Sequence, residues 1–189
     1  MKKNYLDKNI FYIENFLDQK SWKYINNLAQ DSNGWEYKSD IVPQRISKKL
    51  DSDKDNIFWD EFEKKVNNVF YPIKYQSTLT KHISGLLQYK EGFDFNKEFS
   101  LGKHKDDYGY KKAYNINTKD QVLLYGCIYY INDDYQGGEL VYPEKNVEII
   151  PKTNMLVVHS ASDEYEHAVK QVYNGTRYSI PLFYLNKII

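Results

Sequence analysis

The chain has 189 residues, a length typical of one domain, and its 26 Lys and Arg residues balance 26 Asp and Glu residues. Zero net charge speaks against a nucleic-acid-binding module, and the 16% of aromatic residues excludes a disordered chain. The single cysteine, Cys127, excludes a disulfide framework and a cysteine-rich metal site. Because the N-terminal segment has no long apolar run, we expect a cytoplasmic protein with no membrane or nucleic-acid partner.

The first part of the chain predicts a strand followed by two helices. β-branched and aromatic side chains favour the strand, and Trp22, Ile25 and Leu28 recur at helical spacing. Phe58, Phe62, Val66 and Val69 would share one face of the second helix. The expected elements are a strand over residues 9–17, a helix over 22–29 capped by Asp18 or Ser21, a polar loop over 31–55 with at most a short strand, and a helix over 57–69.

After Pro72 the pattern changes to alternating or continuous short apolar runs, which are typical of strands. Residues 136–138 predict a turn, and Asn174-Gly175 predicts a tight hairpin. The expected strands cover residues 83–89, 101–105, 122–132, 139–142, 147–150, 155–159, 168–173 and 177–185. Strands that follow strands after two leading helices indicate an α+β, mainly β fold, either a double-sheet β sandwich or a jelly roll.

His104 and Asp106 are the first candidates for a metal site. On an extended strand these two side chains project to one face, whereas Lys105 points away. A further histidine downstream would complete two nitrogens and one oxygen around a metal, the arrangement that suits non-haem Fe(II) working with O₂. The alternative is a surface histidine beside solvated charges.

Four segments follow in an order that resembles the Fe(II)/2-oxoglutarate-dependent dioxygenases, and within them the prolyl 4-hydroxylase-like branch. The resemblance covers about residues 83–185 and implies a double-stranded β-helix (jelly roll) over 76–189, supported by helices within 1–75, in a single domain 1–189. The segments are CIYYIND (127–133), GGELVYP (137–143), IIPKTNMLVVH (149–159) and EHAVKQVYNGTRYSI (166–180).

The resemblance implies that His104, Asp106 and His167 bind Fe(II). It implies that Arg177, one of only two arginines, pairs with the distal carboxylate of 2-oxoglutarate, because a planar guanidinium meets a carboxylate with two parallel hydrogen bonds. The other cosubstrate-side residues that it implies are Ser179, Tyr130 and Tyr89. The role of the other arginine, Arg45, stays open.

Two further features carry alternatives. His159 could replace His167 as the distal ligand, but His167 lies ten residues before Arg177, which fits the family, so we expect His159 to be a structural residue near the site. The tyrosine-rich segment 106–121, with Tyr108, Tyr110 and Tyr114, is either a substrate lid or an exposed loop.

The implied activity is hydroxylation of an unactivated C–H bond with Fe(II), 2-oxoglutarate and O₂, and ascorbate is a candidate reductant. Analogy favours a prolyl residue in a peptide or protein as the substrate. The alternatives are a free amino acid or small metabolite, a methylated nucleic acid, or a non-catalytic jelly-roll domain that only binds a partner. The oligomeric state stays open.

Overall fold

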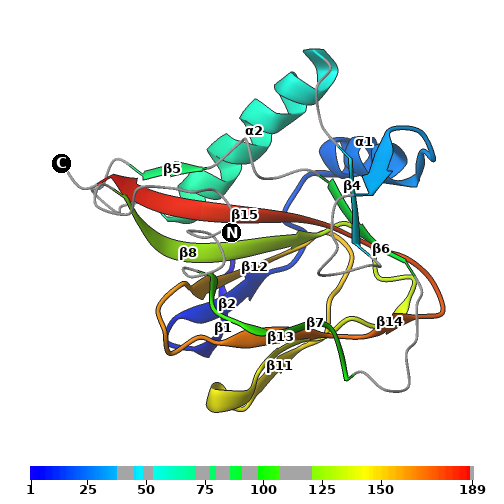
Figure 1. Cartoon of the computed structure of the whole chain (residues 1–189). Coiled ribbons are helices and arrows are strands. Elements are labelled where there is room, and N and C mark those ends of the chain that lie inside the picture. The colour runs from blue at the N-terminus through cyan, green and yellow to red at the C-terminus, as the bar shows by residue number, and fades with distance from the viewer. Residues whose placement is uncertain are drawn as a thin grey trace.

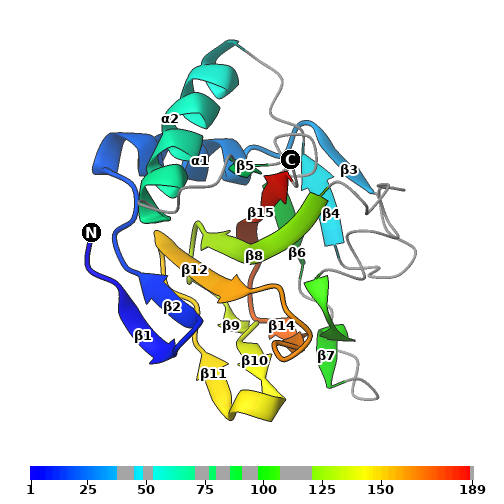
Figure 2. The same cartoon turned by 90° about the vertical axis from the view of Figure 1, so that its left-hand side faces the viewer.

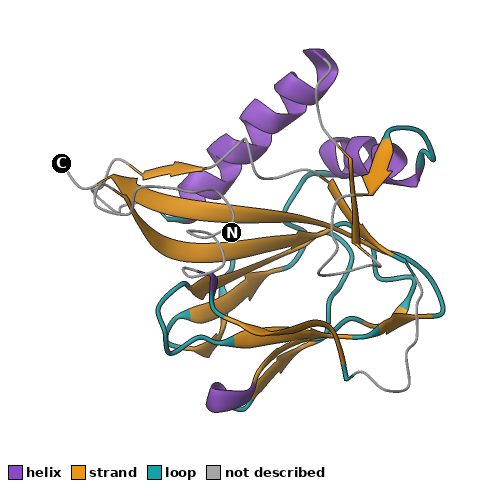
Figure 3. Ribbon diagram, in the orientation of Figure 1, coloured by secondary structure: helices purple, strands orange, loops and turns teal. Residues whose placement is uncertain are grey.

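The computed structural model describes residues 1–37, 45–48, 53–70, 77–79, 86–90, 98–106 and 121–187, and all structural statements refer to these segments. Strands predominate, and Figure 3 shows the few helices beside them. The helices are α1 (Gln19–Gln30), α2 (Asp53–Val69) and the short 3-10 helix η1 (Pro143–Lys145). Among the described residues, no helix combines the length and the apolar character that crossing a membrane would need.

The strands form a large sheet, a smaller sheet and a two-stranded ribbon, and all the pairings are antiparallel. The large sheet contains nine strands: β1 (Asn4–Asp7), β2 (Ile10–Ile13), β3 (Trp35–Tyr37), β4 (Arg45–Lys48), β5 (Ser77–Leu79), β6 (Leu86–Tyr89), β8 (Gln121–Tyr130), β12 (Met155–Ser160) and β15 (Arg177–Lys187). The smaller sheet contains β7 (Phe99–His104), β10 (Leu140–Tyr142), β11 (Val147–Ile149) and β13 (His167–Lys170), and the ribbon pairs β9 (Gln136–Gly137) with β14 (Val172–Tyr173).

The molecule has three layers. In Figures 1 and 2 the two α-helices lie on one side of the large sheet and the smaller sheet lies on the other. The large sheet runs in the order β1-β2-β12-β8-β15-β6-β4-β3, with β5 added beside β15, and the smaller sheet runs β11-β10-β13-β7. Two facing antiparallel sheets with N-terminal helices confirm the mainly β jelly roll that the sequence predicts.

Side chains of the central strands point alternately to the two faces of the large sheet, and each face packs into its own hydrophobic core. On β12, Leu156 and Val158 face the helices and pack with Phe62, whereas Met155 and Val157 face the smaller sheet. This follows from the period of two in a strand, which sends successive side chains to opposite faces. The second core, between the two sheets, is where the candidate site residues lie.

The predicted helices form, and their boundaries shift. Asp18 caps α1, because its Oδ1 accepts a hydrogen bond from the Ser21 amide at 2.9 Å, so Asp18 rather than Ser21 is the N-cap. Helix α2 begins at Asp53, inside the segment for which the sequence predicts a loop. Strands β1, β3, β4 and β5 add to the large sheet. They are only three or four residues long, which is too short to show a clear alternating pattern.

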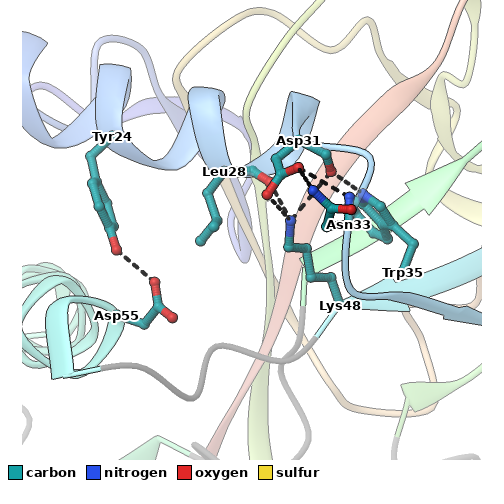
Figure 4. Close-up of polar contacts among 7 residues, drawn as sticks. All are labelled: Tyr24, Leu28, Asp31, Asn33, Trp35, Lys48 and Asp55. Carbon is teal, nitrogen blue, oxygen red and sulfur yellow. Dashed lines mark hydrogen bonds and ion pairs between the residues drawn. The ribbon is translucent and has the colours of Figure 1, made fainter.

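A buried lysine ties the edge of the large sheet to helix α1 (Figure 4). Lys48 is 7% exposed, and its Nζ donates to the carbonyl oxygens of Leu28 at 3.0 Å and Asp31 at 3.3 Å, at the carboxyl end of α1. The ammonium also lies 5.8 Å from the centre of the Trp35 ring. Since β4 pairs with β6, this contact supports the strand that carries Tyr89.

We expect Lys48→Met to lower the free energy of unfolding by about 1–3 kcal/mol, because the Leu28 carbonyl and both Asp31 oxygens lose the ammonium as a donor. The Asp31 carbonyl keeps its hydrogen bond from Trp35 Nε1 at 2.9 Å. Thermal unfolding followed by circular dichroism should show a melting temperature roughly 3–10 °C lower. Lys23→Met, which changes an exposed lysine on helix α1, is the matched control and should leave the melting temperature nearly unchanged. An equal loss in both variants would mean that the Lys48 contacts do not stabilise the fold.

Candidate functional site

The two expected histidine ligands lie opposite each other in the smaller sheet. His104, the last residue of β7, is paired in register with His167, the first residue of β13. Neighbours across an antiparallel pair face the same side of a sheet, and the two ring centres are 4.3 Å apart. Sequence spacing alone did not show this pairing, because 63 residues separate the two positions (167 − 104).

The orientation of both imidazoles is fixed by the backbone. His104 Nδ1 lies 2.8 Å from the carbonyl oxygen of Gly102, and His167 Nδ1 lies 3.0 Å from that of Tyr165. A carbonyl oxygen only accepts, so Nδ1 carries the proton in each ring and the lone pair of Nε2 is left for a metal. Metal-binding histidines commonly donate their second nitrogen in this way.

Asp106 completes the cluster. Its Oδ1 lies 3.8 Å from His104 Nε2 and 3.6 Å from His167 Nε2, and within the described part of the chain these three residues form a group that could hold a metal ion. Two neutral nitrogens and one carboxylate oxygen are a donor set suited to Fe(II). The expected triad is therefore brought together by the fold.

Burial and charge act against each other on these groups. Burial on its own would raise the pKa of Asp106, but attraction to His167, His159 and His104 outweighs it and holds the pKa of this carboxyl below its usual value. Burial lowers the pKa of His167. A carboxylate beside a neutral imidazole is the protonation state that binds a divalent cation.

Arg177, the first residue of β15, is a buried cation that pairs with no carboxylate among the described residues. It is 2% exposed, and its guanidinium carbon lies 4.6 Å from the ring centre of Tyr89 and 5.1 Å from that of Tyr130. Burial would lower the pKa of Arg177, but the phenols of Tyr130, Tyr89 and Tyr135 more than offset it and raise the pKa. Among the described residues no carboxylate pairs with this guanidinium, and the Nη1 contact with the Gly138 carbonyl oxygen is long, at 3.4 Å.

Glycine makes the room that Arg177 occupies. A Cβ at Gly138 would lie 3.3 Å from Arg177 Cδ and 3.1 Å from the Tyr135 ring, and the φ of Gly138 is +71°. An unpaired buried charge is costly, so a site of this kind favours an anionic ligand.

Buried phenols lie between the metal-binding group and Arg177. The Tyr142 ring packs against His167 with ring centres 5.5 Å apart, and Tyr130 interacts electrostatically with both Tyr142 and Arg177. Among the buried groups that the structure describes, the hydroxyls of Tyr130, Tyr135 and Tyr142 and the Nε of Arg177 have no hydrogen-bond partner. Buried polar atoms without a hydrogen-bond partner are available to bind a polar ligand.

Tyr142 and Tyr135 are site residues that sequence reasoning missed. Tyr142 belongs to the GGELVYP segment, and alternation from buried Leu140 places it on the inner face of β10. Tyr135 precedes the Gly137-Gly138 turn and carries no periodic signal of its own. The first could have been found from strand alternation and the second could not.

The remaining predicted residues are placed as follows. Tyr89 and Tyr130 present ring faces to Arg177, and Ser179 is buried on β15 in register with Tyr130. Arg45 lies on β4, where only its backbone is described, paired with Tyr89. Tyr108, Tyr110 and Tyr114 lie outside the described residues.

Comparison with known sequences decides the family. The family model of the 2OG-Fe(II) oxygenase superfamily, where 2OG is 2-oxoglutarate, matches residues 85–185 of this chain. The chain belongs to this superfamily. It is a 2OG-dependent oxygenase, and membership implies Fe(II), 2OG and O₂ as its cofactor and cosubstrates.

Curated relatives match a short part of this oxygenase. Prolyl 3-hydroxylase 2 of Homo sapiens and of Rattus norvegicus are each 31% identical to it over 65 residues. The match spans 32% of this chain and 9% of each of those proteins. It therefore compares one segment of the oxygenase with a small part of much longer proteins.

Solved structures share the fold of the oxygenase along nearly its whole length. The viral collagen prolyl hydroxylase of Paramecium bursaria Chlorella virus-1, in complex with 2OG, has a TM-score of 0.67 and 16% identity, and the match covers 95% of this chain and 97% of that one. A prolyl hydroxylase of Trichoplax adhaerens, in complex with a peptide fragment of hypoxia inducible factor, has a TM-score of 0.66 and 19% identity over 94% and 84% of the two chains. These similarities establish a shared fold.

Proposed function

We propose that this oxygenase hydroxylates a prolyl side chain in a peptide or protein at an unactivated C–H bond. In this proposal His104, Asp106 and His167 bind Fe(II), and Arg177 pairs with the distal carboxylate of 2OG, with Tyr89, Tyr130 and Ser179 around it. The observation that carries it is the combination of three converging metal-ligand atoms with a buried arginine that has no carboxylate partner among the described residues.

The donor atoms fit the metal that the family uses. Both imidazoles offer Nε2, and Asp106 offers Oδ1. Iron bound to this set supplies O₂ activation, in which 2OG is oxidised to succinate and CO₂ and one oxygen atom enters the substrate C–H bond. His104, Asp106 and His167 would hold the metal through three protein atoms, a donor set suited to Fe(II) that works with O₂.

The protein itself orients the carboxylate of 2OG and keeps water out of the site. The fork of Arg177 offers parallel N–H groups to a carboxylate, and the ring faces of Tyr89 and Tyr130 hold the guanidinium in one orientation. The unpartnered hydroxyls of Tyr130 and Tyr135 are available to donate to the same anion. Burial of these groups keeps water away and strengthens each charged hydrogen bond.

The direction of substrate approach follows from exposure. The His104 side chain is 30% exposed, whereas His167 is 4% and Asp106 is 10% exposed. A substrate therefore approaches from the side of β7. A prolyl residue is favoured because the relatives and the solved structures named above are prolyl hydroxylases, two of them described with collagen or with a peptide.

The function is tested with a panel of proline-containing peptides, matched peptides without proline, free amino acids and small metabolites. With Fe(II), 2OG and ascorbate, we expect succinate formation and a gain of one oxygen on a prolyl residue, measured by mass spectrometry. His104→Ala should reduce both to background.

The outcomes separate the parts of the proposal. Oxygen gain only on a free amino acid or metabolite would overturn the prolyl substrate and leave the site intact. Full succinate formation by His104→Ala would overturn the proposed metal site.

A further inference from the structure

A third histidine, His159, is buried beside the proposed metal ligands and has no role in the ligand set. It lies on β12 of the large sheet, is 1% exposed, and its Nε2 is 3.4 Å from Asp106 Oδ2. Its ring centre is 4.6 Å from that of His167 and 5.4 Å from that of Tyr142. The side chain is therefore packed against the site from the opposite sheet.

The two oxygens of Asp106 face different partners. Oδ1 is the oxygen that faces the Nε2 atoms of His104 and His167, and Oδ2 is the one that faces His159. The carboxylate is thus oriented with one oxygen toward the proposed metal position and the other toward the large sheet. A group that holds Oδ2 fixes which oxygen is free for the metal.

A glycine lies directly against the atoms of Asp106 and His159 that meet here. Gly126 on β8 is paired in register with His159, and a Cβ at Gly126 would overlap Asp106 Oδ2 and lie 2.6 Å from His159 Nε2. The backbone of Gly126 does not need glycine for its conformation, because no positive φ is found there. The need for glycine is steric, and it arises from the meeting of Asp106 with His159.

We propose that His159 is a positioning residue that donates a hydrogen bond from Nε2 to Asp106 Oδ2. The Nε2···Oδ2 distance of 3.4 Å is slightly longer than an ordinary N–H···O hydrogen bond, so the attraction comes mainly from the charge of the carboxylate. Nδ1 lies 3.2 Å from the Ser160 carbonyl oxygen, so both neighbours of the ring are acceptors. In His104 and His167 the carbonyl oxygen is much nearer to the ring than Asp106 is, whereas in His159 the two acceptors lie at similar distances, 3.2 Å and 3.4 Å. The ionised carboxylate is then the stronger acceptor and favours a proton on Nε2.

The contact keeps Asp106 as a ligand through one oxygen. A carboxylate that binds through both oxygens occupies two coordination positions, whereas one whose Oδ2 is held by His159 occupies a single position. Held in this way, Asp106 would offer only Oδ1 to a metal. Residues that contact a metal ligand and fix its orientation strengthen metal binding, and their loss weakens the metal affinity by about 10- to 100-fold.

This inference rests on the proposed metal site, so its test measures metal binding apart from turnover. Dissociation constants for Mn(II) are measured by calorimetry for the wild-type chain, His159→Phe, His159→Gln and His104→Ala. We expect His159→Phe to bind Mn(II) about 10- to 100-fold more weakly than the wild type. His159→Gln, whose amide nitrogen can reach Oδ2, should recover most of the loss.

Circular dichroism identifies any variant that fails to fold, and His159→Met, which is apolar and flexible, then replaces His159→Phe. Wild-type affinity in the apolar variant, or a Gln variant as weak as the apolar one, would overturn the inference. A loss in the apolar variant as complete as that of His104→Ala would also overturn it and make His159 a ligand. If the wild type and His104→Ala bind Mn(II) alike, the proposed site itself fails.

Discussion

Replacement of Arg177 by Gln should raise the 2OG concentration for half-maximal succinate formation on the order of a hundredfold or more. The reason is that Gln keeps much of the side-chain volume but removes the buried positive charge that has no acidic partner among the described residues. Truncation of one partner of a buried charge pair costs about 2–5 kcal/mol. Steady-state succinate formation across a range of 2OG concentrations provides the measurement.

Two companion variants make this result specific. Arg177→Lys keeps the charge but loses the fork and should fall between the wild type and Arg177→Gln. Lys170→Gln removes a surface cation of β13 that pairs with Glu148 at 2.8 Å, and it should leave the 2OG dependence unchanged. An unaltered 2OG requirement in Arg177→Gln would show that the dicarboxylate binds elsewhere.

Replacement of Asp106 by Ala should remove the stabilisation that a bound metal gives to the fold. A metal at a hundred times its dissociation constant raises the free energy of unfolding by about 2.7 kcal/mol. For a chain of this length that corresponds to a melting temperature higher by roughly 5–10 °C. We expect the wild type to show this rise with Mn(II) and Asp106→Ala to show none, because the variant lacks the negatively charged ligand of the group.

Thermal unfolding with and without Mn(II), in the absence of 2OG, measures the effect directly. Asp163→Ala is the matched control, since the Asp163 side chain is 86% exposed and pairs with Lys105 at 3.6 Å. It should retain the full metal-dependent rise. A rise of the same size in Asp106→Ala would exclude Asp106 from the metal site.

Both variants probe one feature of the architecture, which is that the site is divided between the two sheets. The smaller sheet supplies His104 and His167, whereas the large sheet supplies Arg177 and Tyr130. The proposed metal ligands and the proposed partner of the 2OG carboxylate can therefore be altered separately. Arg177→Gln should still show the Mn(II)-dependent rise in melting temperature that Asp106→Ala loses.

The sequence predicted the parts of the site that depend on local pattern. Alternation predicted His104 and Asp106 on one face of a strand; in the structure β7 ends at His104 and Asp106 lies just beyond it, yet both side chains reach the same group. The strand that begins at Arg177 carries both the arginine and Ser179. The order of the motifs indicated His167 as the partner. The two main helices were predicted because apolar residues recur along one face of each.

Other parts of the site depend on how distant strands pair, which a local pattern does not encode. The contact of His159 with Asp106 requires β12 to lie beside β8, so that Gly126 leaves space under both side chains. The burial of Tyr135 beside Arg177 depends on the Gly137-Gly138 turn, which the sequence marked only as a turn. Registers of this kind are set by the packing of whole sheets.

The glycine at position 126 restricts which residues this part of the fold can accept. A side chain there would overlap Asp106 Oδ2 first and the His159 ring next. Loss of the histidine alone would not create the space, because the carboxylate oxygen would still lie over the glycine. His159 can therefore be replaced in evolution while Gly126 is retained, whereas a larger residue at 126 requires Asp106 to move or to be replaced.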